Sequence, residues 1–342
     1  MKRKSLLKGL AIVSCVLGGA AAAAADGILL GSTDSSSYYA EGGQPADAAG
    51  DTTRFLSDSN CGDCLDSCCK GPLLGFIAPS DDGFGCFISP MTNPVYFEDP
   101  RTLTEARAIF IQHKIPLRAP LAGGDVQLIA CQFRAALSED LSIIATKDGF
   151  IINGSDGPGQ DGWANVNAGL KYNLYKDYER QRILSAALVF EMPVGSTRAL
   201  QGNGSGVFDL ILTGAAQLND YWRTVAAAGL RLPSDVVDNS QSSYVSVHFD
   251  RTIGNRGLYF LNEYNWYHWM RSGQNGIPGV EGLDLYNFGS TGVAGNNIVT
   301  GAIGLKYRPN FNREFGLAWE VPLTERRDIL DNRITVDAIF RY

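Results

Sequence analysis

The sequence predicts an all-β protein, a transmembrane antiparallel up-and-down β-barrel of about twelve strands. Three observations support this fold class. Apolar and polar residues alternate with a period of two in many stretches between Leu103 and Tyr342, which is typical of pleated strands. The chain starts with an export signal, and Trp and Tyr gather near the ends of the expected strands, as they do in the interfacial belts of membrane proteins.

Residues 1–25 have the layout of a secretory signal peptide, with a basic start, an apolar stretch and an alanine run. We expect cleavage near Ala25, although a retained membrane anchor is an alternative. The stretch from Ile12 to Cys15 also looks like a lipoprotein box, so lipidation of Cys15 stays open. Loss of the signal removes basic residues from a chain whose formal net charge is already −7, which argues against nucleic acid as a partner.

Residues 26–102 are expected to form a flexible N-terminal segment. Positions 26–60 are rich in Ser, Gly, Ala and Asp and hold few large apolar residues, too few to offset the entropy that the chain would lose on folding. Pro and Gly punctuate residues 71–102, which allows only short extended pieces. This part is either a plug that folds back towards the barrel or an irregular linker, and both interpretations stay open.

A cysteine cluster lies in the same N-terminal segment. Its members are Cys61, Cys64, Cys68 and Cys69. Thiols at this spacing could bind zinc or another soft metal. Export favours disulfides instead, because the compartment beyond the inner membrane is oxidising. We therefore expect disulfides and no metal or other cofactor, and the connectivity cannot be deduced from spacing alone.

The expected strands lie in the remaining part of the chain, the barrel domain 103–342. They are placed near 104–113, 125–136, 140–150, 163–175, 181–192, 206–218, 222–232, 242–250, 257–269, 297–307, 313–322 and 329–342. Each is close to the length that a tilted strand needs to cross a bilayer. Short polar turns alternate with long glycine-rich loops, as at the two ends of an outer-membrane barrel. A soluble β-sandwich also alternates, but it seldom places aromatic residues beside its turns.

The same alternation assigns one face of the strands to the lumen. The charged positions on that face are Lys171, Glu191, Asp209, Arg223, Arg231, Asp250, Glu263, Lys306, Glu320, Arg333, Asp337 and Arg341. Acidic and basic side chains balance in this set, so an open pore is expected to show weak ion selectivity. A shift of one residue in register would exchange the two faces.

The last strand carries a more specific pattern, "ITVDAIFRY". Its apolar face consists of Ile334, Val336, Ala338, Phe340 and Tyr342. This pattern resembles the C-terminal strand signal that the barrel assembly machinery recognises in bacterial outer-membrane proteins. The region from Leu103 onward is similar to uncharacterised transporter-like barrels grouped with aromatic-degradation (MetA-type) pathway proteins. The resemblance implies the outer membrane of a bacterium with a two-membrane envelope, contact with its lipid, and a transport role.

These observations favour a passive channel or transporter for small solutes. A structural or anchoring barrel with a filled lumen is the alternative, because small barrels can be filled by side chains or plugged. His268, Ser272 and Asn275 faintly resemble the His, Ser and Asn of outer-membrane phospholipases. Those enzymes place the serine two residues after the histidine, whereas Ser272 lies four residues after His268. We therefore assign no catalytic residue and expect no enzyme.

Overall fold

The computed structural model describes residues 71–117, 119–254 and 256–342. These ranges consist of β-strands, their connections and one short 3-10 helix, η2 (Thr197–Ala199). Across these ranges, no helix is both long enough and apolar enough to cross a membrane. The predicted signal peptide and the cluster Cys61, Cys64, Cys68 and Cys69 lie outside the described residues.

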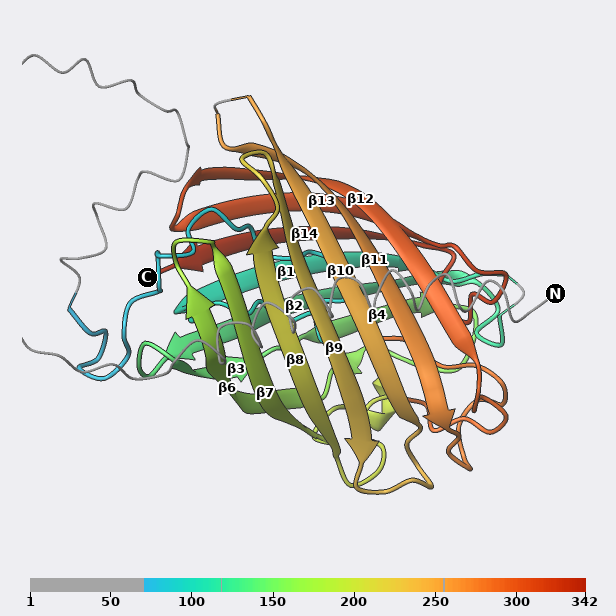
Figure 1. Cartoon of the computed structure of the whole chain (residues 1–342). Helices are drawn as coiled ribbons and strands as arrows, with labels where there is room; N and C mark the ends of the chain where they lie inside the picture. The colour runs from blue at the N-terminus through green and yellow to red at the C-terminus, as the bar shows by residue number, and fades with distance from the viewer. Residues whose placement is uncertain (1–70, 118, 255) are drawn as a thin grey trace, which may run out of the picture. The chain divides into compact units, whose positions relative to one another are not determined.

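The strands follow one another around the barrel in chain order (Figure 1). Their bounds are β1 (Glu105–Lys114), β2 (Gly124–Ala136), β3 (Leu141–Ala145), β4 (Phe150–Ser155), β5 (Gly162–Trp163), β6 (Val166–Asp177), β7 (Arg182–Met192), β8 (Val207–Gln217), β9 (Trp222–Pro233), β10 (Gln241–Ile253), β11 (Leu258–Arg271), β12 (Asn297–Asn310), β13 (Arg313–Pro322) and β14 (Asn332–Arg341). Each expected strand corresponds to one of these elements or to a pair of them.

The sheet closes on itself, because β1 pairs with both β2 and β14 in antiparallel register. β3 and β4 lie one after the other along β2. On their other side, β5 pairs with β4 and β6 pairs with β3. β3 and β4 together therefore form one strand of the wall, and β5 and β6 together form the next. The barrel has twelve strands in all. The predicted fold class is confirmed.

One expected strand, 140–150, is interrupted in the structure between β3 and β4. The backbone amides of Thr146 and Lys147 both donate to Oδ1 of Asn167, at 2.7 Å each. This side-chain acceptor takes the place of a partner in the strand ladder, as happens where a strand bends away from its neighbour. Gly149 follows with φ of 108°, a conformation that a residue with a Cβ rarely adopts.

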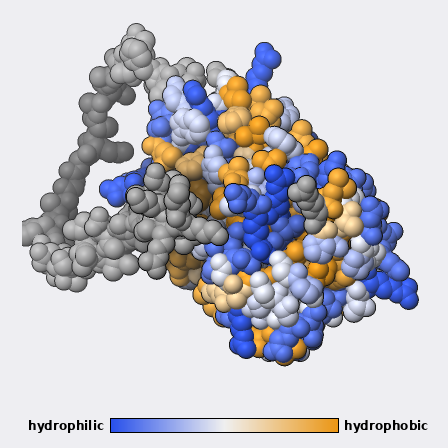
Figure 2. Space-filling model, turned by 90° about the vertical axis from the view of Figure 1, so that its right-hand side faces the viewer, coloured by the Kyte–Doolittle hydropathy of each residue, from blue (hydrophilic) through white to orange (hydrophobic). Residues whose placement is uncertain are grey.

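The two faces of the wall meet different surroundings. In β13, Phe315, Leu317 and Trp319 are exposed on the outside, whereas Glu314 and Glu320 are buried inside. An outer face of large apolar side chains suits contact with lipid, where unsatisfied polar groups are costly. Figure 2 looks onto one end of the barrel and shows hydrophilic residues gathered in the middle of that face, beside hydrophobic surface.

Short turns lie at one end of the barrel and longer connections at the other. The turns 137–140, 178–181, 218–221, 254–257 and 311–312 share the end at which β14 finishes. The opposite end carries the connections between β7 and β8, β11 and β12, and β13 and β14, of which 272–296 is the longest. In outer-membrane barrels, short turns face the periplasm and long loops face the exterior.

Residues 80–104, which we call the luminal segment, lie inside the barrel. The segment starts at the short-turn end, where the Ser80 amide donates to the Tyr342 carbonyl at 2.8 Å; in Figure 1 the cyan chain before β1 is seen beside the C-terminus. Every residue from Cys86 to Thr104 is buried. The segment reaches the far side at Tyr96, whose hydroxyl donates to the Leu283 carbonyl of the 272–296 loop at 3.2 Å, and then returns to join β1.

Candidate functional site: the barrel lumen

All the charged side chains that the sequence assigned to the lumen are buried in the structure. They are Lys171, Glu191, Asp209, Arg223, Arg231, Asp250, Glu263, Lys306, Glu320, Arg333, Asp337 and Arg341. They do not surround an open pore. Many of them contact the luminal segment, and most of the others pair with charged side chains of the wall or with the 272–296 loop. Asp209 accepts from the Tyr244 hydroxyl.

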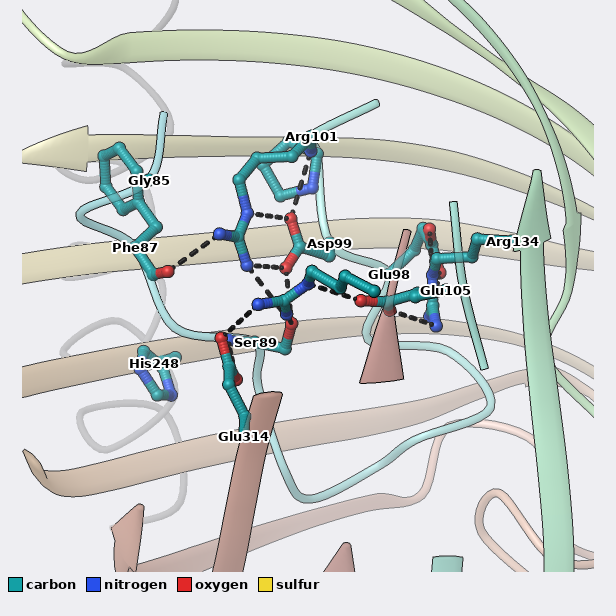
Figure 3. A network of polar contacts seen from close by, with 12 residues as sticks. Gly85, Phe87, Ser89, Glu98, Asp99, Arg101, Glu105, Arg134, His248 and Glu314 are labelled. Atoms are coloured by element: carbon teal, nitrogen blue, oxygen red, sulfur yellow. Dashed lines mark hydrogen bonds and ion pairs between the residues drawn. The ribbon is translucent and has the colours of Figure 1, made fainter. Parts of the chain in front are cut away.

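The luminal segment and the wall share a polar network near the short-turn end (Figure 3). Arg341 bridges two wall carboxylates, with Nε 2.7 Å from Glu105 and a terminal nitrogen 2.6 Å from Glu314. Its other terminal nitrogen donates to Oγ of Ser89 at 2.8 Å. Within the segment, Arg101 forms a two-pronged contact with Asp99, at 3.0 and 2.7 Å. These charge-assisted bonds fix the path of the segment.

Lys306 extends this network along β12. Its ammonium group lies 3.1 Å from Glu314 and 3.2 Å from Asp337, and it donates to the Ser89 carbonyl at 2.7 Å. Gly316 of β13 leaves room for the segment here, because a Cβ at this position would come within 2.5 Å of Sδ of Met91. The wall is therefore shaped as well as charged to receive the segment.

A second cluster, on β10 and β11, holds the backbone of the segment. The Glu263 carboxylate accepts hydrogen bonds from the amides of Met91 and Thr92, at 2.7 and 2.6 Å. His248, in register with Glu263 on the neighbouring strand, lies 2.7 Å from the same carboxylate. The other ring nitrogen of His248 lies 3.3 Å from Asp250. Sequence reasoning missed Glu263 as a partner of His248, because only the register between β10 and β11 brings these two residues side by side.

Glu98 carries the charge of the segment into a third cluster. Its carboxylate accepts from two nitrogens of Arg134, at 2.6 to 3.2 Å, and from Nζ of Lys171 at 2.7 Å. Arg134 also pairs with Glu105 at 3.0 Å, the residue directly opposite it on β1. Lys171 donates in addition to the Asp99 carbonyl at 2.5 Å.

A fourth cluster lies towards the long-loop end. Glu191 pairs with Lys147 at 2.5 Å and with Arg231. Arg231 also donates to the Tyr96 hydroxyl at 2.5 Å, and Tyr96 stacks on Tyr244 with the ring centroids 4.9 Å apart. Aromatic stacking and a charged donor together position the far end of the segment.

The 272–296 loop closes the opposite mouth. Asp284 of this loop lies 2.8 Å from the buried guanidinium group of Arg333. Glu281 accepts from Ser240 at 2.6 Å and from the amides of Phe288 and Ser290, at 2.9 Å each. Burial raises the pKa of Glu281 above its ordinary value, although these hydrogen bonds oppose the rise.

Asp328, in the connection between β13 and β14, ties the loops together. Its carboxylate accepts from the Glu281 amide at 3.0 Å and lies 2.8 Å from Nε of Arg326. Burial raises the pKa of Asp328 to about 6, while the Arg326 guanidinium group acts in the opposite direction. The contact between the two connections is therefore sensitive to mildly acidic pH.

Two small cavities lie beside these contacts in the described part of the chain. One cavity of about 20 Å³ is lined by Pro94, Gln132 and Asp284, among others. Another of about 10 Å³ lies beside Asn165 and Glu191. A larger hollow of about 830 Å³ lies at the long-loop end, between Lys114 and Asp331.

Several luminal side chains were missed by sequence reasoning. They are Glu105, Arg107, Arg134, Lys147 and Glu314. Four of them share the inward parity of their strands, so extending the same alternation to β1, β2 and the start of β13 would have found them. Lys147 lies in the interruption between β3 and β4, where the alternation is lost.

The three residues that resemble phospholipase positions do not converge. His268 contacts Asn297 at 3.0 Å and stacks on Trp266. The Ser272 hydroxyl accepts from the amides of Val293 and Ala294, and Asn275 donates to Asp238. Each therefore has a separate structural partner. In the described part of the chain, no group of three or more His, Cys, Asp or Glu side chains could hold a metal ion.

The apolar face of the last strand points outward. Ile334, Val336 and Phe340 are exposed on the outer surface, and Ala338 and Tyr342 are half-buried. Phe340 packs edge-on against Phe315 of β13, with the ring centroids 6.0 Å apart. The structure thus places these residues on the lipid-facing side, and their role in barrel assembly remains a prediction.

Comparison with known proteins bears on the fold. No family model and no curated protein match the sequence, so the MetA-type grouping remains a prediction. A crystal structure of an outer membrane channel from Pseudomonas putida F1 matches 75% of this chain and 100% of that chain, with a TM-score of 0.51 and 12% sequence identity. The NanC porin covers 70% of this chain and 100% of its own, with a TM-score of 0.45 and 6% identity. The KdgM porin covers 69% of this chain and 99% of its own, with a TM-score of 0.41 and 10% identity.

The similarity to the Pseudomonas putida channel is one of fold, and it agrees with the geometry of the barrel itself. The wall is closed, its strands are antiparallel, and large apolar side chains cover the outside. A closed wall leaves no unpaired edge in lipid, which is the condition that any membrane-spanning sheet must meet. The chain therefore has the fold of a bacterial outer-membrane β-barrel.

Proposed function

We propose that this protein is a gated outer-membrane channel for small solutes, in which the luminal segment acts as a displaceable plug. The observation that carries the proposal is the way the segment is held. Within residues 80–104 it adds no strand to the wall. Wall side chains bind it through hydrogen bonds and ion pairs, and Phe87, Met91 and Phe97 pack in apolar clusters with wall residues. All these contacts are non-covalent, and the polar ones can be exchanged for water without breaking the strand ladder.

The chemistry of the wall supports a channel. A barrel filled only for stability gains little from buried ion pairs, because replacing them with packed apolar residues is often neutral or stabilising. A charged wall suits a channel, because it stays hydrated when the luminal segment moves out of the lumen. An apolar wall would expel water from the same space. The same balance of acidic and basic side chains leads us to propose weak ion selectivity for the open form.

A structural barrel with a permanently filled lumen is the second candidate, and the small volume of the internal cavities favours it. The two functions differ in one measurable property. A displaceable plug opens a conducting path when it moves or is removed, whereas a barrel whose lumen is filled permanently does not conduct while the segment is in place.

Conductance in planar bilayers tests the proposal. We expect purified protein to conduct rarely, and a variant that lacks residues 80–101 to conduct steadily with little preference for cations or anions. Deletion of residues 71–76, which are exposed outside the barrel, is the control and leaves conductance unchanged. If the 80–101 deletion forms a heat-modifiable barrel and still does not conduct, the channel function is wrong and the structural one is supported.

A further inference from the structure

The side of the lumen around Glu98 is built to donate hydrogen bonds to oxygen atoms. Besides Lys171 and Arg134, Ser185 donates to the Pro100 carbonyl at 2.6 Å and Thr213 to the Glu98 carbonyl at 2.7 Å. Figure 3 shows Glu98, Glu105 and Arg134 lying together. The wall here therefore donates hydrogen bonds to several oxygen acceptors of the luminal segment. The carboxylate of Glu98 is the charged acceptor among them.

Removal of the segment would leave this region with excess positive charge. Both acceptors of the Lys171 ammonium group, the Glu98 carboxylate and the Asp99 carbonyl, belong to the segment. Arg134 would keep only its pairing with Glu105. Two buried cations would then face one wall carboxylate, and an unpaired buried cation is costly unless an anion or water replaces the lost partner.

Ser142 provides an independent sign of a ligand site. It lies on β3 in direct register with Lys171, and its side chain is fully buried. Its hydroxyl finds no hydrogen-bond partner among the described residues. Buried hydroxyl groups are usually paired, so an unpaired one beside Lys171 is suited to a further oxygen ligand.

We propose that Arg134, Lys171 and Ser142 form a carboxylate-binding site, which Glu98 occupies when the barrel is closed and a small organic acid occupies during passage. The inference rests on the proposed function, since a solute reaches the site only after the segment moves. It adds a substrate class, namely solutes that carry a carboxylate. Arg134 supplies a planar pair of donors that matches a carboxylate, and Lys171 supplies a point charge.

Chemical rescue tests the site without relying on conductance. Glu98→Ala removes the carboxylate from the full-length protein and leaves space for a small anion. Unfolding is followed by the temperature at which the faster-migrating folded barrel disappears from detergent gels. We expect this temperature to be lower for the variant than for the wild type, and we expect acetate to restore it. Acetamide, the uncharged counterpart of acetate, should have no effect. Glu139→Ala, at an exposed position in the 137–140 turn, is the matched control, which acetate leaves unchanged.

Lys171 decides whether the rescue is specific. In Glu98→Ala/Lys171→Gln, at least tenfold more acetate is needed for the same rescue. Equal rescue with and without Lys171, or equal rescue by acetamide, overturns the site. Should Glu98→Ala fold poorly, Glu98→Gln replaces it in the rescue experiment, because it keeps the side-chain volume. A second measurement uses the wild-type protein, in which acetate competes with Glu98 for the site. Acetate must then accelerate trypsin cleavage after the buried Arg101 more than acetamide does.

Conductance separates the two proposals. If Glu98→Ala opens the channel and acetate closes it in a manner that depends on Lys171, both the channel and the site are supported. If rescue by acetate depends on Lys171 but neither Glu98→Ala nor the 80–101 deletion conducts, the site stands and the channel function fails. If the channel opens but acetate has no effect that depends on Lys171, the channel stands and the site is wrong.

Discussion

Individual charges in the lumen are matched to particular oxygen atoms rather than to a general field. Lys306 illustrates this, because its ammonium group meets two wall carboxylates and one carbonyl of the luminal segment. Breaking a buried ion pair from one side leaves the partner charged, buried and short of contacts. Single substitutions in the lumen should therefore cost more than surface substitutions of the same kind.

For Lys306→Met we expect a loss of about 3 kcal/mol in the free energy of unfolding, because Glu314 and Asp337 lose a buried cation. Urea denaturation of the refolded protein in detergent measures this loss. Lys176→Met removes a more exposed ion pair with Asp140 and is expected to cost less than about 1 kcal/mol. Equal losses in the two variants would contradict the structural role of the luminal contacts.

Asp328 gives the loops a pH dependence. Its folded-state pKa of about 6 lies above the ordinary value of 3.8, so its contribution to stability is fully present below about pH 4 and is lost as pH rises through 6. We expect the Glu281 amide, which donates to Asp328, to exchange its hydrogen more slowly at pH 5 than at pH 7.5, after correction for intrinsic exchange rates. Asp328→Asn should abolish the difference, whereas Asp235→Asn, at a half-buried position in the β9–β10 connection, should keep it.

Among the elements, β14 combines two roles, since it closes the seam with β1 and carries the predicted assembly signal. Phe340→Ser should sharply reduce the amount of barrel assembled in cells, because the aromatic residue near the end of the strand is part of that signal. Phe315→Ser changes its packing partner on β13 and serves as the control. Western blotting of outer-membrane fractions compares the two, and equal yields would mean that Phe340 acts only through packing.

The elements also show what the sequence could predict. Alternation is a local property, so strands such as β6, β7 and β13 were readily recognised from their own residues. The interruption before β4 depends on the side chain of Asn167, a residue distant in sequence. The path of the luminal segment depends on partners from many strands, and its Pro and Gly residues give no periodic pattern to follow. Hence the plug and linker interpretations could not be separated beforehand.

For the whole molecule, closure of the wall predicts resistance to detergent. Apart from the two-residue β5, every strand in the described part of the chain is paired on both sides, so the wall offers almost no edge for local opening. We expect the mature protein to run faster on detergent gels unheated than boiled, and to fractionate with the outer membrane. A variant with Ala226→Pro would lack a ladder donor in β9, in the middle of the wall, and should lose the shift. Migration unaffected by boiling, with recovery from the periplasm, would favour the soluble sandwich.

The luminal segment begins and ends at the same mouth of the barrel, near Tyr342 and at the start of β1. It is therefore a loop that enters the barrel and returns, and neither of its ends passes through the opposite opening. Withdrawal thus requires no unthreading and creates no knot. This topology also allows two orders of assembly. In particular, β1 can pair with β14 first, and the luminal segment can enter the closed barrel afterwards.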